Sequence, residues 1–431
     1  MSLPSLIEIQ PVAGPLSAPV TVTVPGSKSL TNRALVLAAL GDGVMTLRGA
    51  LWSEDTQVMA DCLSRLGFEV AVGHDPEEAA NRSITVRGLG GRIPGGGSAE
   101  APLELHVGNA GTAARFLAAM VCLGQGVYRL SGVPRMHERP QAELFGALRA
   151  MGYRIESSND RLPATIYGTG PRSARGWVSA DASSQFASAL LLSARAGGWD
   201  IEVQGGNEEE LPYVQMTRRL VEVFPPNGGE FDIEADASSG SYFWAAGHLL
   251  SAGAASGPVV QVRRWPSTGW QVDEAFPRYL GPRAQISRQT DLGDSIMTAI
   301  VLAPFGRAPC RFTDLGRLRV QECERVEALR TELTRCGARV EESGDTLTVW
   351  PSPLRGAEIE TYGDHRMAMC FAVVALKVPG IRLKDPGCVR KTFPNFFAKL
   401  ALPAPAGVGV RILQPGSREV LSGAQLLADP T

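Results

Sequence analysis

Residues 27–40 read SKSLTNRALVLAAL, a polar opening that runs directly into a stretch of small and aliphatic residues. Short polar side chains favour helix starts because they accept hydrogen bonds from the first backbone N–H groups. The residues after the opening are nearly all apolar, so a helix formed by them is expected to be buried on every side. The same design recurs in five further stretches, which begin at Asn109, Ser183, Ser238, Gly293 and Gly363. The sequence therefore predicts six buried helices.

A second, amphipathic helix is predicted after each buried one, ending near a glycine and leading into an alternating strand. The interval from Lys28 to Gly67 is 39 residues, that from Ser184 to Gly228 is 44, and the other four lie between these values. The alternative explanation is coincidence, because the chain contains 48 glycines. Such even intervals instead indicate six copies of one supersecondary unit, three in residues 25–235 and three in 236–431. The clear amphipathic helices are DCLSRLGFEVAV (61–72), ALRAMGYRIES (147–157) and LRTELTRCGARVEES (329–343), and weaker ones end near Gly228, Gly281 and Gly407.

The composition is that of a globular protein, with 44% hydrophobic and 20% charged residues among 431. A formal net charge of -2 leaves no global basic surface, so no nucleic-acid partner is expected. The seven cysteines are scattered and form no CxxC pair, which argues against a disulfide framework or a zinc ribbon and fits a reducing cytoplasm. We expect no signal peptide and no membrane span, because no long apolar run occurs.

The predicted helix starts carry an unusual set of charges for the mouths of apolar helices. A helix N-terminus presents unpaired N–H groups and a partial positive charge, and it therefore attracts anions. Any one opening alone is simply a good N-cap, but six buried helices are expected to converge with their starts on one cleft between two domains. The charges there need paired or liganded surroundings, and they belong to Lys28, Arg33, Arg115, Asp294, Asp364 and Arg366.

Three further segments add charged residues to this set. Residues 134–140, PRMHERP, place two arginines and a glutamate between prolines in what is expected to be a rigid loop. Residues 319–325, RVQECER, place Glu322 and Arg325 three apart at the start of an amphipathic helix, a spacing that also suits an ordinary surface ion pair. Lys391 precedes a bulky apolar turn.

These residues together resemble the motif set of the EPSP synthase family of enolpyruvyl transferases. The matching stretches run in order from about residue 20 to residue 400, so the resemblance covers nearly the whole chain. Eight ordered motifs are far more specific than one. The motifs are VPGSKSLTNRALVLAAL, GNAGTAARFLAAM, SGVPRMHERP, DASSQFASALLL, EADASSGSYF, RVQECERVEAL, TYGDHRMAMCF and KTFPNFF.

The resemblance implies an α/β, two-domain enolpyruvyl transferase fold with six βαβαββ units, three per domain, around an interdomain cleft. Because the first strand of the family returns to the C-terminal domain, one domain is expected to comprise residues 1–24 plus 236–431 and the other residues 25–235. The resemblance also implies a cytoplasmic monomer without metal or organic cofactor. The expected reaction transfers the enolpyruvyl group of phosphoenolpyruvate to the 5-hydroxyl of shikimate 3-phosphate and releases phosphate, a step in the biosynthesis of aromatic amino acids.

The site residues implied by the resemblance fall into three groups. The catalytic group has Asp294 as base for the hydroxyl and Glu322 as acid and base at C3, with Lys28 and Lys391 sharing proton duties. Phosphoenolpyruvate is expected to bind Lys28, Gly111, Arg135, Gln185, Arg325, Arg366 and Lys391. The acceptor is expected to bind Lys28, Ser29, Arg33, Ser183, Ser184, Gln185, Tyr213, Asp294 and Gln321.

Some positions depart from the family pattern, mostly on the acceptor side. Gln321 stands where lysine is usual, Glu210 where serine is usual, and Arg317 where asparagine is usual; Glu324 replaces an aspartate and Phe116 a proline. Two alternatives therefore stay open, namely an enolpyruvyl transferase for another anionic acceptor and a catalytically silent metabolite binder. The retained acids argue against the second, and the absence of a cysteine in VPRMHERP argues against a uridine-sugar substrate. Inhibition by the herbicide glyphosate is expected, because Gly111 lies where the family keeps room for it.

Overall fold

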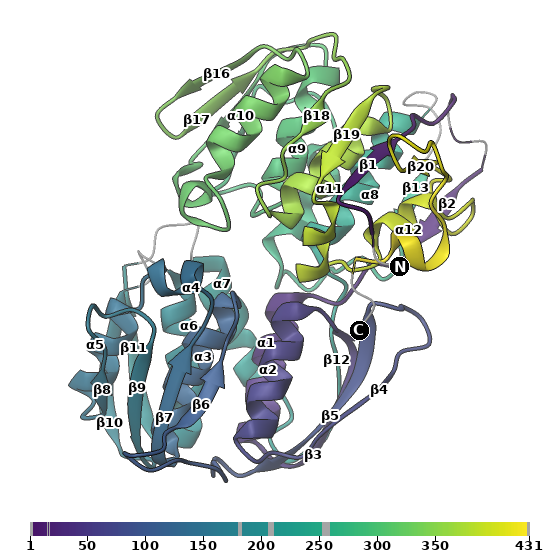
Figure 1. Ribbon diagram of the computed structural model, residues 1–431. Helices are drawn as coiled ribbons and strands as arrows, with labels where there is room; N and C mark the ends of the chain where they lie inside the picture. The colour runs from purple at the N-terminus through teal and green to yellow at the C-terminus, as the bar shows by residue number, and fades with distance from the viewer. Residues whose placement is uncertain are drawn as a thin grey trace. The chain divides into compact units, whose positions relative to one another are not determined.

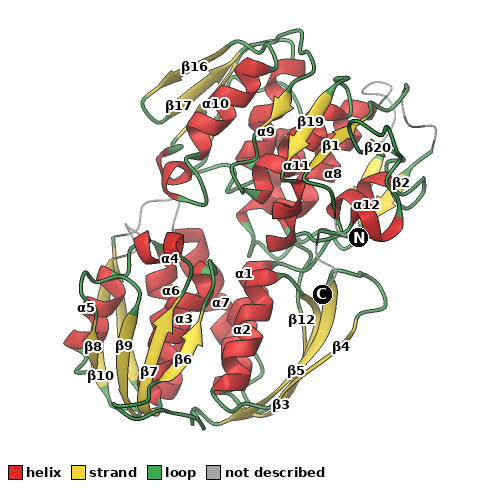
Figure 2. Cartoon of the chain, viewed as in Figure 1, coloured by secondary structure: helices red, strands yellow, loops and turns green. Residues whose placement is uncertain are grey.

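The computed structural model describes residues 3–14, 16, 18–179, 183–205, 211–251 and 259–428. Contacts between Cα atoms divide the chain into two compact units (Figure 1). The central unit is Gly26–Glu234, and the terminal unit joins Met1–Pro25 to Ala235–Thr431. In both units sheets flank the helices (Figure 2). No helix within the described ranges is long and apolar enough to cross a lipid bilayer.

Three buried helices form the centre of the central unit, and they contact one another. They are α1 (Lys28–Leu40), α3 (Gly111–Met120) and α6 (Ser184–Gly197). Every residue of α3 is buried, and only Lys28, Ser29 and Leu37 of α1 are partly exposed. The prediction that these helices are buried all round is therefore confirmed for α3 and holds for nearly all of α1, whereas α6 is not buried all round and exposes Arg195.

The sheets of the central unit repeat one pattern of strand directions. In each four-stranded sheet the first pair of strands is parallel and the other two pairs are antiparallel. One sheet has the order β12 (Gly229–Asp232), β3 (Asp42–Leu51), β5 (Asn81–Leu89), β4 (Val70–His74), and the other β6 (Leu103–His106), β7 (Gln125–Ser131), β9 (Ala164–Thr169), β8 (Arg154–Glu156). A two-stranded parallel sheet pairs β10 (Ala174–Ser179) with β11 (Trp199–Gln204). The outer, amphipathic helices are α2 (Glu54–Arg65), α5 (Ala142–Ala150) and α7 (Leu211–Val223).

The terminal unit is built in the same way around its own three helices, which also contact one another. These are α8 (Ala237–Leu250), α9 (Ile296–Leu302) and α11 (His365–Ala375), with α10 (Arg325–Arg335) and α12 (Phe396–Ala401) outside them. The four-stranded sheets have the orders β18 (Glu358–Ile359), β19 (Ile381–Lys384), β1 (Leu6–Ile9), β20 (Ile412–Leu413), and β14 (Gln285–Ser287), β15 (Cys310–Thr313), β17 (Thr346–Val349), β16 (Val340–Ser343). A two-stranded parallel sheet pairs β13 (Val260–Val262) with β2 (Val20–Val22).

The first strand of the chain lies inside the sheet formed by the last segments. Leu6 pairs with Lys384 and Ile9 with Ile381, in antiparallel register, while Glu8 pairs with Leu413 on the other side of β1. Ile7 and Ile9 are fully buried. The N-terminal strand of the chain therefore shares a sheet with strands from its last segments.

The structure departs from the sequence expectations in two places. Within the described residues, the third and fourth repeats have two-stranded sheets instead of the full four-stranded pattern. In the fourth repeat Pro277 lacks an N–H and interrupts the amphipathic helix, which forms the 3-10 helix η2 (Val272–Tyr279). Residues 134–140 contain the short helix α4 (Pro134–Glu138) where a loop was expected, since proline at the first helical position loses no hydrogen bond.

Candidate active site

The centre of the candidate site in the terminal unit is the ion pair between Arg325 and Asp364. Arg325 opens α10 and is 1% exposed, and its Nε lies 2.7 Å from Oδ2 of Asp364. Asp364 is fully buried and also accepts a hydrogen bond from the backbone N–H of Arg366 at 2.8 Å. One carboxylate therefore holds the starts of α10 and α11 together.

Glu322 lies between two cations. Its Oε2 is 2.8 Å from Nη2 of Arg325, and its Oε1 is 3.0 Å from Nζ of Lys391. Lys391 ends η5 (Pro386–Lys391) and is 8% exposed. This arrangement keeps an acid and an amine in direct contact at the edge of the same buried network.

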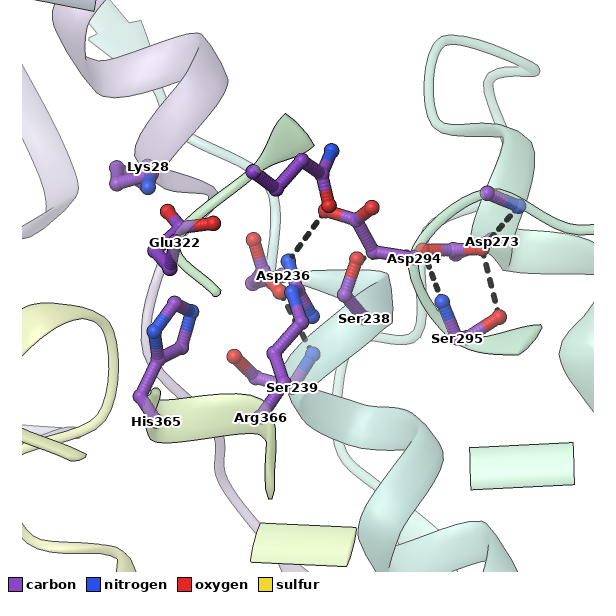
Figure 3. Close-up of polar contacts among 12 residues, drawn as sticks. Lys28, Asp236, Ser238, Ser239, Asp273, Asp294, Ser295, Glu322, His365 and Arg366 are labelled. Carbon is purple, nitrogen blue, oxygen red and sulfur yellow. Dashed lines mark hydrogen bonds and ion pairs between the residues drawn. The ribbon is translucent and has the colours of Figure 1, made fainter. Parts of the chain in front are cut away.

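Asp294 faces three arginines from three different segments. Its carboxylate oxygens lie 2.9 Å from Nη2 of Arg366 (Figure 3). They lie 3.4 Å from Nη2 of Arg288 and 3.8 Å from Nη1 of Arg325. Burial raises the pKa of this carboxyl, but the charges of Arg366, Arg325 and Arg288 outweigh it and hold the pKa well below its usual range. The charges of Asp364, Glu322 and Asp294 together raise the pKa of Arg325, although burial alone would lower it. Asp294 is therefore ionised, and its charge is neutralised by its neighbours.

The loop that carries Asp294 is held by a second carboxylate, Asp273 at the start of η2. Asp273 is 2% exposed, and its oxygens accept hydrogen bonds from the backbone N–H groups of Gly293 at 2.7 Å and Ser295 at 3.1 Å and from the hydroxyl of Ser295 at 2.6 Å (Figure 3). The hydroxyl of Ser238 donates to the same group at 2.5 Å. Burial raises the pKa of Asp273.

Sequence reasoning missed Asp273 and Arg288. Neither belongs to a helix opening or to a quoted motif, and the proline-rich stretch around Asp273 has no helical or strand period. The one available signal was Asp273 itself, a charged residue that follows Trp270 and Gln271 in an otherwise irregular segment.

Gln321 adds an uncharged contact to this network, because its Oε1 accepts a hydrogen bond from Nη1 of Arg325. Arg317 lies just before it, in η4 (Gly316–Val320). Glu210, the third unusual position of the acceptor side, lies outside the described residues.

In the central unit, Arg33 is a buried cation held by neutral groups. It is 2% exposed, and it donates to Oγ1 of Thr217 at 2.7 Å, to the carbonyl of Ser29 at 2.9 Å and to Oγ of Ser188 at 3.1 Å. Its guanidinium lies 5.3 Å from the ring centre of Phe116. Burial lowers the pKa of Arg33 to about 10. Within the described part of the chain no carboxylate pairs with Arg33. A bound anion would therefore supply the negative charge that balances its guanidinium.

The other predicted residues of the central unit lie at helix starts. Lys28 opens α1 and pairs with the buried Asp55 at 3.0 Å. Ser183 caps α6 and accepts a hydrogen bond from the N–H of Gln185 at 3.3 Å, while Ser184 is the first residue of that helix. Tyr213 lies on α7, where its carbonyl accepts a hydrogen bond from Thr217.

Gly111 and Arg135 complete the predicted set. A Cβ atom added at Gly111 would lie 2.8 Å from Nη2 of Arg139 and 3.0 Å from Nη1 of Arg115, so two guanidinium groups approach the backbone at the start of α3. Arg135 lies on α4, is about half exposed at its side chain and pairs with Glu138 at 2.5 Å. The structure thus joins Asp294, Gln321, Glu322, Arg325, Arg366 and Lys391 into one network, and it places the central-unit residues on α1, α3, α4, α6 and α7 and at the cap of α6.

Comparison with known proteins gives concordant results. The family model for EPSP synthase (3-phosphoshikimate 1-carboxyvinyltransferase) matches residues 13–226 and 283–400. The 3-phosphoshikimate 1-carboxyvinyltransferase of Nostoc punctiforme is 38% identical over 430 residues, which cover 91% of this chain and 98% of the relative. That of Trichormus variabilis is 39% identical over 88% of this chain and 95% of its own length.

Two solved structures are similar in fold. An EPSP synthase from Acinetobacter baumannii covers 95% of this chain and all of its own, with a TM-score of 0.73 and 20% identity. The enolpyruvyl transferase NikO from Streptomyces tendae covers 90% of this chain and 94% of its own, with a TM-score of 0.63 and 15% identity.

Proposed function

The chain belongs to the EPSP synthase (3-phosphoshikimate 1-carboxyvinyltransferase) family, and we propose that it transfers the enolpyruvyl group of phosphoenolpyruvate to the 5-hydroxyl of shikimate 3-phosphate. It is a transferase of the shikimate pathway, because relatives named 3-phosphoshikimate 1-carboxyvinyltransferase match it over nearly their whole length. The observation that carries the proposal is the buried network in which two acids, Asp294 and Glu322, meet the cations Arg325, Arg366 and Lys391.

The cations of this network suit the donor. Phosphoenolpyruvate carries a phosphate and a carboxylate, and the planar fork of arginine binds both groups with paired hydrogen bonds. Arg325 and Arg366 are held at the starts of adjacent helices by Asp364, so their positions are set before the donor arrives. We assign the donor to Arg325, Arg366 and Lys391 together with Lys28, Gly111, Arg135 and Gln185.

The acceptor is assigned to the environment of Arg33. A fully buried guanidinium surrounded by hydroxyl and carbonyl groups is costly without an anion, and the carboxylate of shikimate 3-phosphate would supply one. Ser183 and Ser184 present a helix start, which suits the acceptor phosphate. The full acceptor set is Lys28, Ser29, Arg33, Ser183, Ser184, Gln185, Tyr213, Asp294 and Gln321.

The reaction proceeds by addition and elimination. Asp294 takes the proton of the 5-hydroxyl, the oxygen bonds to C2 of phosphoenolpyruvate, and Glu322 gives a proton to C3. Glu322 then removes a proton from C3 and the bond from C2 to the phosphate oxygen breaks, which forms the enol ether. Inorganic phosphate leaves together with the proton that Asp294 had accepted, so that Asp294 is ionised again. Lys391 contacts Glu322 and Lys28 opens α1, which makes these amines the candidates for sharing the proton transfers.

Donor binding also changes the state of Asp294. In the free protein Asp294 is the anion bound by Arg366 and Arg325, and these same arginines are assigned to the donor. When the donor anions take over these ion pairs, Asp294 loses part of the positive charge that lowers its pKa and becomes a stronger base. The base is therefore activated in the presence of the donor.

The proposed partners are the two small-molecule substrates, and the chain is proposed to act as a monomer in the cytoplasm. Support for a reducing compartment comes from the cysteines, since all seven are free thiols in the structure.

The test is phosphate release from phosphoenolpyruvate in the presence and absence of shikimate 3-phosphate. Release that needs both substrates supports the proposal. Release with phosphoenolpyruvate and a different anionic alcohol, but not with shikimate 3-phosphate, would establish another acceptor, an outcome for which the uncharged Gln321 gives a specific reason. The absence of turnover with any acceptor, despite donor binding, would contradict the assignment as a transferase.

A further inference from the structure

Asp273 lies in a stretch that the family model leaves unmatched, residues 227–282, yet its carboxylate is buried directly behind the proposed base. It accepts four hydrogen bonds of 2.5–3.1 Å, which is about the full capacity of a carboxylate. Lining up this many donors on one buried acid fixes the segments that carry them.

The donors bracket Asp294 in the chain. Gly293 precedes Asp294 and donates its backbone N–H, and Ser295 follows it and donates both its N–H and its hydroxyl (Figure 3). The fourth donor, Ser238, belongs to α8 and not to this loop. Three of the four bonds therefore hold the two residues on either side of the base, two of them through backbone N–H groups.

Asp294 needs such an anchor, because its side chain is pulled by Arg366, Arg325 and Arg288 from different segments. The start of α9 provides none of its own, since Ser295, the N-cap, makes no side-chain capping bond. If the pull of the arginines changes when the donor binds, only the backbone anchor keeps the carboxylate at a fixed place for the acceptor hydroxyl. A base that is misplaced by about 1 Å loses on the order of 100-fold in rate.

We propose that Asp273 is the positioning residue for Asp294: its hydrogen bonds to Gly293 and Ser295 hold the base in place for proton transfer, without contact to either substrate. This role rests on the proposed function. It predicts a loss mainly in kcat and not in donor binding, because Arg325 and Lys391 are held by Asp364 and Glu322, and the backbone of Arg366 is held by Asp364.

The experiment compares two variants that each remove one hydroxyl group that donates a hydrogen bond to Asp273. Ser295→Ala removes a hydrogen bond to the loop of the base, and Ser238→Ala removes one to α8. Ser295→Ala is expected to lower kcat about 5- to 20-fold, with the KM for phosphoenolpyruvate within about twofold of wild type, whereas Ser238→Ala keeps the wild-type kcat. Asp273→Asn retains the shape but loses charge and acceptor capacity, and it is expected to lower kcat by about 100-fold.

The outcomes separate the positioning role from a purely structural one. Equal effects of Ser295→Ala and Ser238→Ala, or a loss in the two variants that follows their thermal stability, would overturn the proposal. A parallel rise in the KM for phosphoenolpyruvate would do the same. If Asp273→Asn does not fold, the two serine variants still decide. Glu78→Gln, a change at another buried carboxylate in the central unit, controls for the loss of a buried charge. Wild-type protein without turnover would instead contradict the proposed function itself.

Discussion

Nη2 of Arg366 lies 2.9 Å from Oδ2 of Asp294, so a cation assigned to the donor is paired with the acid assigned as the base. The two residues are far apart in sequence and come from the start of α11 and the loop before α9. In the free protein Asp294 therefore occupies the guanidinium of Arg366 that is assigned to the donor. The charge of Arg366 in turn lowers the pKa of Asp294, so that Asp294 accepts a proton less readily until the donor binds Arg366. Substrate binding and base strength are coupled through this one contact.

Replacing Arg366 tests the coupling. Arg366→Ala is expected to raise the KM for phosphoenolpyruvate and to lower kcat/KM by about 10- to 100-fold, as for loss of a charged hydrogen bond. Because the pKa of Asp294 is depressed, removing one cation raises it, and the ionised base is then lost at higher pH as the pH falls. The acid limb of the plot of kcat/KM against pH is therefore expected to move to higher pH. The remaining charged neighbours of Asp294 are Arg288 and Arg325, which lower its pKa, and the acids Glu322 and Asp273.

A matched control for this variant is Arg382→Ala, which removes an arginine that pairs with Glu8 on the exposed surface of the terminal unit. It is expected to leave both constants and the pH profile unchanged. Wild-type kinetics in the Arg366 variant would refute its assignment to the donor.

Asp364 is expected to matter for stability as well as for binding. Asp364→Asn leaves Arg325 buried with less compensating charge, and breaking a buried pair costs about 3–5 kcal/mol. The measurement is the free energy of unfolding in urea. Asp61→Asn, which removes an exposed i,i+4 pair with Arg65, is the comparison and is expected to have no measurable effect. Equal stability of the two variants would show that Asp364 is dispensable to the network.

A side chain at Gly111 is predicted to displace the guanidinium groups at the start of α3 and so to weaken donor binding. In Gly111→Ala the new methyl group would lie 2.8 Å from Nη2 of Arg139, so the guanidinium must shift at the start of α3. The expected result is a higher KM for phosphoenolpyruvate with little change for the acceptor. Glyphosate is expected to compete with phosphoenolpyruvate in the wild type and to bind more weakly in the variant, measured by inhibitor titration. Gly146→Ala, where an added Cβ meets no atom within 4 Å, is the control.

Gln321 reports on the acceptor. If the acceptor is shikimate 3-phosphate, Gln321→Lys is expected to improve its turnover or leave it unharmed, because a lysine adds a charge beside the base. The amide oxygen that Arg325 now contacts would be lost, and Glu322 and Asp364 still hold that arginine. If the variant shows no gain while a different anionic alcohol is a better substrate for the wild type, the acceptor is different, and Glu210 is the first residue to exchange.

Local patterns in the sequence predicted the parts of the site that are local in the structure. The buried helices follow from their apolar composition. The contact between Glu322 and Arg325 joins residues three apart in the sequence, one before α10 and one at its start. The capping role of Asp364 is also local, since it binds the N–H of Arg366.

The rest of the site depends on contacts between distant segments. Arg325 and Asp364 are 39 residues apart, and Asp273 reaches Gly293 across 20 residues from a stretch without secondary-structure period. The partners of Arg33 lie on α6 and α7, so its burial without a paired acid appears only when α1, α6 and α7 are packed together. The 3-10 helix of the fourth repeat was missed because Pro277 interrupts a helix that was inferred from spacing alone.

The position of β1 has a consequence for the folding of the protein during its synthesis. Leu6–Ile9 are synthesised long before their partners on β19 and β20. The sequence of the central unit is continuous, so it can form its own core while the ribosome is still translating the remainder. The strand β1 stays unpaired, with Ile7 and Ile9 exposed, until β19 and β20 have been translated, and this is its waiting time. A circular permutant that starts at Gly26 and places residues 3–25 after the present C-terminus would remove that wait, and it should reach the native state with less aggregation during synthesis.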